Sequence, residues 1–279
     1  MKRIHAAGPR SIAIPDTLLE ERESLREKTV KLGQIARACS IFGVDFVIVF
    51  RDTHGRGESG LIRRVLEYLE TPQYLRKRLF PLDESLKYSG LLPPLRIPSH
   101  KPKVAAESLR PGEFREGVVL EGGRSVDVGL DEPLELDQVT KALSRVTVKI
   151  SGTRPLRGVL SDRSMVTEYW GYSVEERALD SVLSDGRFGL KIATSRLGEP
   201  LAKCFTGLAN SVATASGVMV LFGSPSRGLF EMVGDLSRRV DLVLNLYPEQ
   251  HVATVRTEEA IASALYLLEV LSLRQNPKV

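Results

Sequence analysis

Residues 245–260, NLYPEQHVATVRTEEA, connect two apolar segments through an unusually polar stretch of chain. The preceding run, VDLVLN, is apolar as in a covered strand, and EEAIASALYLLEVL has the length and apolar content of a closing helix. The threonine and two glutamates at 257–259 are typical helix caps, because side-chain oxygens and negative charge satisfy the free amides of a first turn. Capping needs only one or two such residues. The surplus of Asn, Gln, Thr and Arg predicts that this loop also holds a ligand.

Two further strand candidates in the second half of the chain end in similar loops. LKIA (190–193) is followed by TSRLG (194–198), and VMVLF (218–222) is followed by GSPSRG (223–228). In a parallel sheet, ligands bind just beyond the carboxyl ends of the strands, and glycine there permits close backbone approach. Three such loops at one edge of a sheet predict a small-molecule site.

The first ninety residues alternate between strand and helix patterns. SIAIP (11–15) and VDFVIVF (44–50) are apolar runs expected as parallel strands. We expect a helix from Asp16 to about Phe42 between them and a second helix over LIRRVLEYLE (61–70). This order is typical of an α/β fold.

The pattern changes at GLLPPLRIPSHKP (90–102), where four prolines exclude a helix or central strand and indicate a connector. FREGVVLEGGRSVDVGL (114–130) predicts a hairpin that turns at its Gly-Gly pair. RVTVKIS (145–151) and RGVLSDRSM (157–165) add further strand candidates.

The α/β pattern resumes near Tyr169. The simplest interpretation is one α/β domain formed by residues 1–94 and 168–279, interrupted by a small β domain of residues 95–167. Trp170, at the junction, is expected to pack rather than to stack on a base.

The bulk composition indicates a globular protein, with 279 residues, 42% hydrophobic and 27% charged. A net charge of +4 permits an acidic partner without requiring one. Cys39 and Cys204 are the only cysteines, and four scattered histidines lack metal-ligand spacing, so we predict no metal and a reducing, cytoplasmic location. No apolar run reaches the ~18 residues of a membrane span, so no membrane association is expected.

Common nucleotide and hydrolase motifs are missing from the sequence. A nicotinamide site would show G-x-G-x-x-G after an early strand, and a phosphate-binding loop would show GK[ST]; neither is found. No G-x-S-x-G marks a hydrolase nucleophile.

A set of segments spans nearly the full length of the chain in a fixed order: SIAIPDTLLEE, LREKTVKLGQIARACSIFGVD, ETPQYLRKRLFP, LKYSGLLPPL, YWGY, IATSRLG, FGSPSRGL and YPEQHVATVRTEEA. In these segments the chain resembles the SPOUT methyltransferases, and within them the archaeal and eukaryotic RNA methyltransferase family whose knotted domain is interrupted by an oligonucleotide-binding-like barrel. Ala193 and His251 stand where this resemblance leads us to expect glycine.

The resemblance implies a trefoil-knotted, Rossmann-like parallel sheet, an inserted OB-like β barrel, and S-adenosylmethionine bound in the C-terminal knot. Thr194 and Ser195 could instead begin the next helix, and Asn245 and Gln250 could be structural turn residues. The residues expected to bind the cofactor are Thr194, Ser195, Gly198, Gly223, Ser224, Gly228, Leu229, Asn245, Gln250, Thr254, Val255, Arg256 and Thr257.

Methyl transfer requires alignment of donor and acceptor, and an N–H or O–H acceptor must also lose its proton. Asp52, beyond the 44–50 strand, is the candidate base, and Arg51 beside it is a candidate orienting group. Arg256 is expected to contact an RNA phosphate or the acceptor base; the alternative is an ion pair with Glu258 or Glu259.

The expected substrate is a structured RNA, ribosomal or transfer RNA, and the expected assembly is a homodimer. For the β domain, the alternative to RNA binding is a mere spacer. Two competing functions are a non-catalytic RNA-binding or ribosome-assembly factor that retains a cofactor pocket, and a nucleotide-binding enzyme on the same scaffold. The residues expected to bind RNA are Arg76, Lys77, Arg78, Lys149, Arg154 and Arg157.

Overall fold

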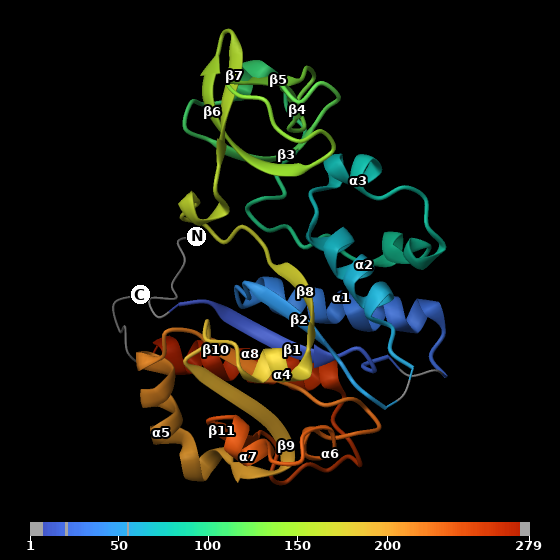
Figure 1. Cartoon of the computed structure of the whole chain (residues 1–279), viewed down its shortest axis with the longest axis vertical. Coiled ribbons are helices and arrows are strands. Elements are labelled where there is room, and N and C mark those ends of the chain that lie inside the picture. The colour runs from blue at the N-terminus through green and yellow to red at the C-terminus, as the bar shows by residue number, and fades with distance from the viewer. Residues whose placement is uncertain (1–7, 20–21, 55, 274–279) are drawn as a thin grey trace. The chain divides into compact units, whose positions relative to one another are not determined.

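The computed structural model describes residues 8–19, 22–54 and 56–273 (Figure 1). By its internal contacts the chain divides into two compact units. The larger holds the described residues up to 67, residues 85–93 and residues from 172 onward, and the smaller holds residues 68–84 and 94–171. None of the described helices is long and apolar enough to cross a membrane. The predicted domain boundaries, 94/95 and 167/168, stay a prediction, because a division by internal contacts does not show which parts fold independently.

The larger unit is built on a six-stranded sheet in the order β11-β9-β10-β1-β2-β8, and every neighbouring pair is parallel. All carboxyl ends therefore lie along one edge, so the loops after β9, β10 and β11 share that edge as predicted. The strands are β1 (Arg10–Pro15), β2 (Phe46–Arg51), β8 (Ser173–Ala178), β9 (Leu190–Pro200), β10 (Val218–Leu221) and β11 (Leu242–Asn245).

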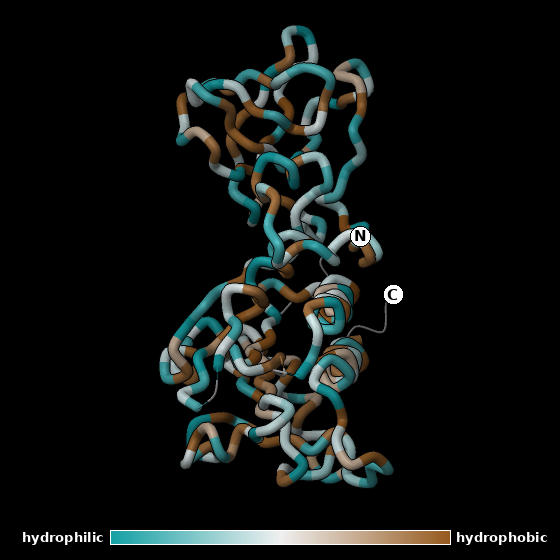
Figure 2. The backbone as a smooth tube through the Cα atoms, turned by 90° about the vertical axis from the view of Figure 1, so that its right-hand side faces the viewer, coloured by the Kyte–Doolittle hydropathy of each residue, from teal (hydrophilic) through white to brown (hydrophobic). Residues whose placement is uncertain are grey.

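Helices cover the sheet on both faces. One face packs Ala13, Ile48, Phe50, Met219 and Leu221 against the short helices α4, α6 and α7. On the alternate residues of the strands, α1, α5 and α8 pack beside one another, with α8 in contact with both. Figure 2 shows the apolar segments gathered inside each unit. The helices are α1 (Leu25–Ile41), α2 (Ser59–Glu70), α4 (Leu179–Leu183), α5 (Leu201–Thr214), α6 (Leu229–Met232), α7 (Leu236–Arg239) and α8 (Thr257–Leu273).

One sequence expectation for this unit is wrong, and one strand was not expected. The first helix begins at Leu25, not Asp16, because Ser24 and Glu27 form a reciprocal capping box that fixes its start. Leu18 and Leu19 are buried in the preceding loop instead. β8 was not anticipated, because its sequence SVEERA has the charged composition of an exposed edge strand.

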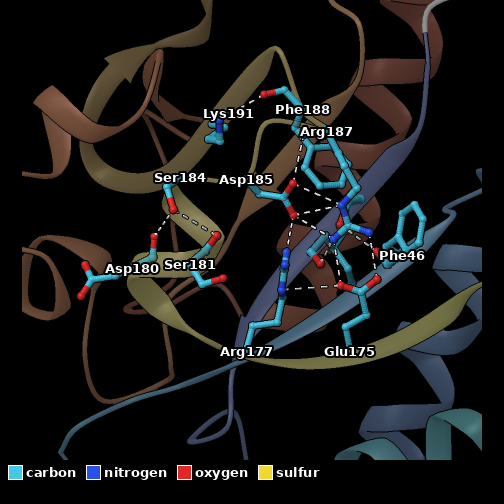
Figure 3. A network of polar contacts seen from close by, with 12 residues as sticks. Phe46, Glu175, Arg177, Asp180, Ser181, Ser184, Asp185, Arg187, Phe188 and Lys191 are labelled. Atoms are coloured by element: carbon cyan, nitrogen blue, oxygen red, sulfur yellow. Dashed lines mark hydrogen bonds and ion pairs between the residues drawn. The ribbon is translucent and has the colours of Figure 1, made fainter.

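A polar network holds β8 and its following turn against the sheet (Figure 3). The guanidinium of Arg187 donates to both carboxylate oxygens of Glu175, at 2.9 and 2.8 Å, and to Asp185. It also lies 4.5 Å from the ring centre of Phe46. Arg177 pairs with Asp185 as well. Burial opposes ionisation of Asp185, but the arginine side chains outweigh it and lower its pKa to about 2, so the network is charged at neutral pH.

The smaller unit contains a closed five-stranded barrel in the order β3-β4-β5-β7-β6. β5 and β7 pair in parallel, and the other pairs are antiparallel. The predicted hairpin is confirmed, and Gly122 and Gly123 occupy positive φ at its turn. The strands are β3 (Phe114–Val119), β4 (Ser125–Asp127), β5 (Leu134–Leu136), β6 (Arg145–Thr153) and β7 (Leu156–Ser161), with α3 (Gln73–Leu79) in the same unit. The predicted fold class, a parallel α/β sheet interrupted by a small β barrel, is confirmed; the threading of the knot stays a prediction.

A buried ionic network within the smaller unit ties the barrel to Glu70, the last residue of α2. Glu70 is 3% exposed and accepts from Arg145 at 2.5 Å and from Arg163 at 2.9 Å. Glu116 accepts from Arg145 at 2.6 Å and from the indole of Trp170 at 2.5 Å. Burial opposes ionisation of Glu116, but the nearby arginines outweigh it and lower its pKa. Trp170, 2% exposed, is therefore a packing residue, as expected.

His100, in the smaller unit, has a pKa that the fold lowers. Its Nε2 lies 2.7 Å from the Glu70 carbonyl oxygen, and burial, reinforced by nearby arginines, lowers its pKa to about 4. Between pH 6.5 and 4 the unfolded chain binds a proton that the folded chain does not, so stability should fall as pH falls through this range, by about 3 kcal/mol in all. His100→Gln keeps a donor but no titration, so urea denaturation between pH 7 and 4 should show a shallower loss. His251→Gln, at an exposed position, is the control and should leave the slope unchanged. Equal slopes in the wild type and His100→Gln would contradict this assignment.

Candidate functional site

A cleft of about 1190 Å³ lies within the larger unit at the carboxyl edge of the sheet. It is bordered by the end of β9, the loops that follow β10 and β11, and residues 23–34 before and within α1. Gly198 and Leu229 lie outside its lining. The other predicted cofactor residues line it: Thr194, Ser195, Gly223, Ser224, Gly228, Asn245, Gln250, Thr254, Val255, Arg256 and Thr257.

The first loop proves to be a bulge inside β9. β11 pairs Val243 with Ala193 and then Leu244 with Glu199, so residues 194–198 loop out between two consecutive pairs. A Cβ on Gly198 would lie 2.7 Å from the Val243 carbonyl oxygen. Glycine is therefore required here for contact between β9 and β11.

The second loop, residues 223–228, is a tight turn closed by Ser224. Its backbone N–H donates to the Arg227 carbonyl at 2.9 Å, and its hydroxyl accepts from the Arg227 N–H at 3.0 Å. A Cβ on Gly223 would lie 2.8 Å from the same Arg227 carbonyl. Leu229, fully buried, anchors the turn in the core at the start of α6.

Polar side chains brace the third loop, residues 246–256. They belong to the surplus of Asn, Gln, Thr and Arg that helix capping does not explain. The Asn245 amide donates to the Arg196 carbonyl at 3.0 Å and accepts from the Tyr247 N–H at 3.0 Å. The Gln250 amide donates to Val252 and Ala253 carbonyls within the loop. Asn245 and Gln250 thus have structural contacts in the loop and also line the cleft, so their contact with a cofactor stays a prediction.

One hydrogen bond joins the first and third loops directly, and two others tie the second loop to α8 and the bulge to β10. The Arg196 guanidinium donates to the Ala253 carbonyl at 3.2 Å, which links the bulge to the third loop. The Thr257 hydroxyl donates to the Gly223 carbonyl at 3.5 Å, so it ties the second loop to α8 rather than capping the helix. The Thr194 hydroxyl likewise donates to the Leu221 carbonyl at 3.0 Å.

Arg256 presents its side chain at the mouth of the cleft. It is exposed and lines the cleft, while its backbone N–H donates to the Glu259 carboxylate at 2.9 Å. Within the described part of the chain its guanidinium makes no ion pair with Glu258 or Glu259. The guanidinium is therefore available to a ligand.

Asp52 does not line the cleft, and both of its carboxylate oxygens accept hydrogen bonds. It accepts from Arg227 at 2.6 Å and from the His54 N–H at 3.1 Å on one oxygen, and from Thr17 at 3.1 Å on the other. Its own backbone N–H donates to Asp16, whose pKa burial raises. Neither Asp52 nor the exposed Arg51 lines the cleft.

Arg227 is the functional candidate that the sequence analysis missed. It lines the cleft, and its guanidinium is held by the 2%-exposed side chain of Asp52. The signal was present as the arginine of GSPSRG, but its partner is 175 residues away in sequence and only the fold brings the two together.

The predicted RNA-binding residues of the smaller unit fall into two groups. Arg76 donates to the carbonyls of Leu69 and Thr71, and Arg78 pairs with Asp127 at 2.7 Å, so both have structural partners. The other residues are exposed: Lys77 on α3, Lys149 and Arg157 on β6 and β7, and Arg154 at the β6–β7 turn.

Within the described residues, no group of three or more His, Cys, Asp or Glu side chains is placed to hold a metal ion. Cys39 and Cys204 are both free thiols, and burial raises the pKa of each.

An α/β unit with a large cleft at the carboxyl edge of a parallel sheet is typical of proteins that bind a small molecule there. The family is shown directly: residues 10–268 match the family described as "Putative RNA methyltransferase", and the chain belongs to it. The protein is accordingly a methyltransferase whose family acts on RNA.

Two relatives and one solved structure illustrate the similarity. An uncharacterized protein of Halobacterium salinarum is 37% identical, over 92% of this chain and 97% of its own. The human 28S rRNA (uridine-N(3))-methyltransferase is 32% identical, over 93% of this chain and 77% of its own. The crystal structure of an RNA 2'-O ribose methyltransferase aligns with a TM-score of 0.41 and 10% identity, over 97% of this chain and 57% of its own. This TM-score and this identity are too low to assign a function.

Proposed function

We propose that this protein uses S-adenosylmethionine to methylate N3 of a uridine in large-subunit ribosomal RNA. The observation that carries the proposal is the 32% identity, over 93% of this chain, to a human protein named as a 28S rRNA (uridine-N(3))-methyltransferase. The sequence led us to expect ribosomal or transfer RNA as the substrate, and the proposal restricts this to large-subunit ribosomal RNA.

The cleft fits this cofactor in size and chemistry. Its 1190 Å³ exceeds the roughly 300–1,000 Å³ of an ordinary ligand pocket, which leaves room for the cofactor and an acceptor base together. Leu244, Leu246, Tyr247 and Val255 offer apolar walls among hydroxyls and amides. When bound, the cofactor supplies an electrophilic methyl group on a sulfonium. Gly198 and Leu229 lie outside the lining and support its loops. The predicted cofactor residues that line the cleft would contact the cofactor, and those whose side chains already brace the loops would do so through their backbone groups.

The chain's own contribution is alignment and charge. Direct displacement of a methyl group depends on donor and acceptor being held in line, which interlocked loops favour. We propose that Arg256, exposed in the lining of the cleft, orients the acceptor or its phosphate; a role for Arg51, which does not line the cleft, stays a prediction. Asp52, with both oxygens occupied, is better suited to hold Arg227 in the cleft than to take a proton.

The first experiment measures cofactor binding and transfer. Titration calorimetry should show binding of S-adenosylhomocysteine, and tritium from labelled S-adenosylmethionine should enter unmodified large-subunit ribosomal RNA as 3-methyluridine identified by mass spectrometry. Absence of heat and of a thermal shift at millimolar ligand would contradict the cofactor. Binding without transfer would favour the alternative, a non-catalytic RNA-binding or ribosome-assembly factor.

We further propose that the barrel is OB-like and binds RNA. Such barrels track single strands with basic grooves. Lys149 and Arg157 share the outward face of the β6–β7 hairpin, since Lys149 pairs with Val159 and side chains two residues apart on a strand share a face. Arg154 lies at the hairpin turn, and Lys77 on α3 is a further exposed cation. Arg76 is held by backbone carbonyls, whereas Arg78 pairs with Asp127 at the surface and keeps 51% of its side chain exposed.

Replacing Lys149, Arg154 and Arg157 together by alanine should weaken RNA binding and flatten its salt dependence, by roughly one unit of log–log slope for each phosphate that the variant no longer neutralises. Affinity for S-adenosylhomocysteine should be unchanged, because the cleft lies in the other unit. A control with exposed Lys203 and Arg238 changed to alanine should keep the full slope. An unchanged slope in the triple variant would indicate that the barrel is a spacer.

We also propose a homodimer formed through α8. Tyr266 is 62% exposed and Ile41 57% exposed, and the Tyr266 ring packs edge-on against Phe42, so an apolar patch remains open where the C-terminal end of α1 meets the middle of α8. Light scattering should give twice the 30.8 kDa chain mass, and Tyr266→Glu should shift the population toward one chain. A wild-type mass of a single chain at micromolar concentration would refute the dimer.

A further inference from the structure

The carboxylate of Glu258 is buried in the wall of the cleft without a partner. The residue is 7% exposed, lines the cleft and lies in the first turn of α8. Its Oε2 is inaccessible and accepts no hydrogen bond, and within the described residues no cation lies within ion-pair distance of the side chain. A buried carboxylate oxygen without a hydrogen bond is costly, so its presence in the lining of a cleft calls for a specific explanation.

Helix capping does not account for Glu258. The capping contact at this helix end is made by Glu259, whose carboxylate accepts from the Arg256 N–H at 2.9 Å. Thr257 instead bonds the second loop. Glu258 therefore lines the cleft with a carboxylate that satisfies no backbone group of its own helix.

The other acidic residues that line the cleft are engaged or exposed. Glu23 pairs with Lys31 at 2.6 Å, Glu27 closes the capping box with Ser24, and Glu231 is exposed. Asp52 lies outside the lining with both oxygens occupied. Of the acids described around the cleft, Glu258 combines burial, a position in the lining and a free lone pair.

We propose that Glu258 is the catalytic base that takes the imino proton of the acceptor uracil. This rests on the proposed function, because a ring N–H acceptor must lose its proton as its nitrogen is methylated. The N–H proton passes to the Glu258 carboxylate, and the nitrogen forms a bond to the methyl carbon as the carbon–sulfur bond breaks with its electron pair going to sulfur. The neutral carboxylic acid then returns its proton to water.

The neighbouring cations fit this role. The exposed guanidinium of Arg256, two residues before Glu258, offers a donor to the carbonyl oxygens that flank the imino N–H of uracil. Arg227, held by Asp52, provides a second fixed positive charge in the lining. Uracil presents two carbonyl oxygens, one on either side of its imino N–H. Guanidinium donors can bond the carbonyl oxygens, and a carboxylate, which only accepts, can bond the N–H.

The test is Glu258→Gln, which keeps size and removes the base. With wild-type protein active on in vitro transcribed large-subunit ribosomal RNA, the variant should lose about 100-fold or more in turnover. The calorimetric Kd for S-adenosylhomocysteine and the affinity for the transcript should each stay within about twofold of wild type, since the carboxylate acts on the proton and not on binding. Thermal unfolding of the ligand-free variant should occur at the same or a higher temperature, because an unsatisfied buried charge is removed. Glu258→Asp should retain part of the turnover.

Glu249→Gln is the matched control, at an exposed position nearby in sequence and outside the cleft lining. It should keep wild-type turnover. Wild-type turnover in Glu258→Gln would overturn the proposal, and so would a tenfold weaker Kd for S-adenosylhomocysteine, which would assign the carboxylate to the cofactor. An inactive wild type that still bound the cofactor would instead remove the proposed function itself.

Discussion

The site depends on one feature of strand pairing, the bulge of residues 194–198 between two consecutive pairs of β9 with β11. It forces five residues out of the sheet at the edge where the loops after β10 and β11 also emerge. Arg196, within the bulge, then bonds the third loop, and Asn245 at the end of β11 bonds back to the bulge. The cleft wall is therefore held by backbone carbonyls and side-chain donors rather than by apolar packing alone.

This arrangement separates structural from chemical polar groups. Asn245, Gln250, Thr194 and Thr257 use their side chains to hold loops in shape. Among the charged groups Asp52 fixes Arg227, whereas Glu258 and Arg256 make no ion pair in the described structure. Side chains that the fold holds in position without giving them a partner are those that a ligand can bind.

The smaller unit shows the same separation among its cations. Arg145, Arg163 and Arg115 serve buried carboxylates or carbonyls, and Arg76 and Arg78 have partners within the unit. Lys149, Arg154 and Arg157 remain exposed on one hairpin. Counting basic residues in the sequence therefore overstates the surface that an RNA phosphate can reach, because burial and pairing remove several of them.

The sequence by itself determined the α/β pattern, the inserted β region with its Gly122–Gly123 hairpin, the three loops at one sheet edge and the start of α8. Periodicity, turn chemistry and caps are local, so these features can be read from neighbouring residues. The start of α1 depended on whether Ser24 or Asp16 capped it, and the edge strand β8 carries no apolar pattern. Tertiary structure alone decided that Asp52 binds Arg227, that Asn245 at the end of β11 bonds the bulge at Arg196, and that Glu258 is buried without a partner. These properties depend on contacts between residues far apart in sequence, or on which face of a helix is covered, and neither is encoded in local pattern.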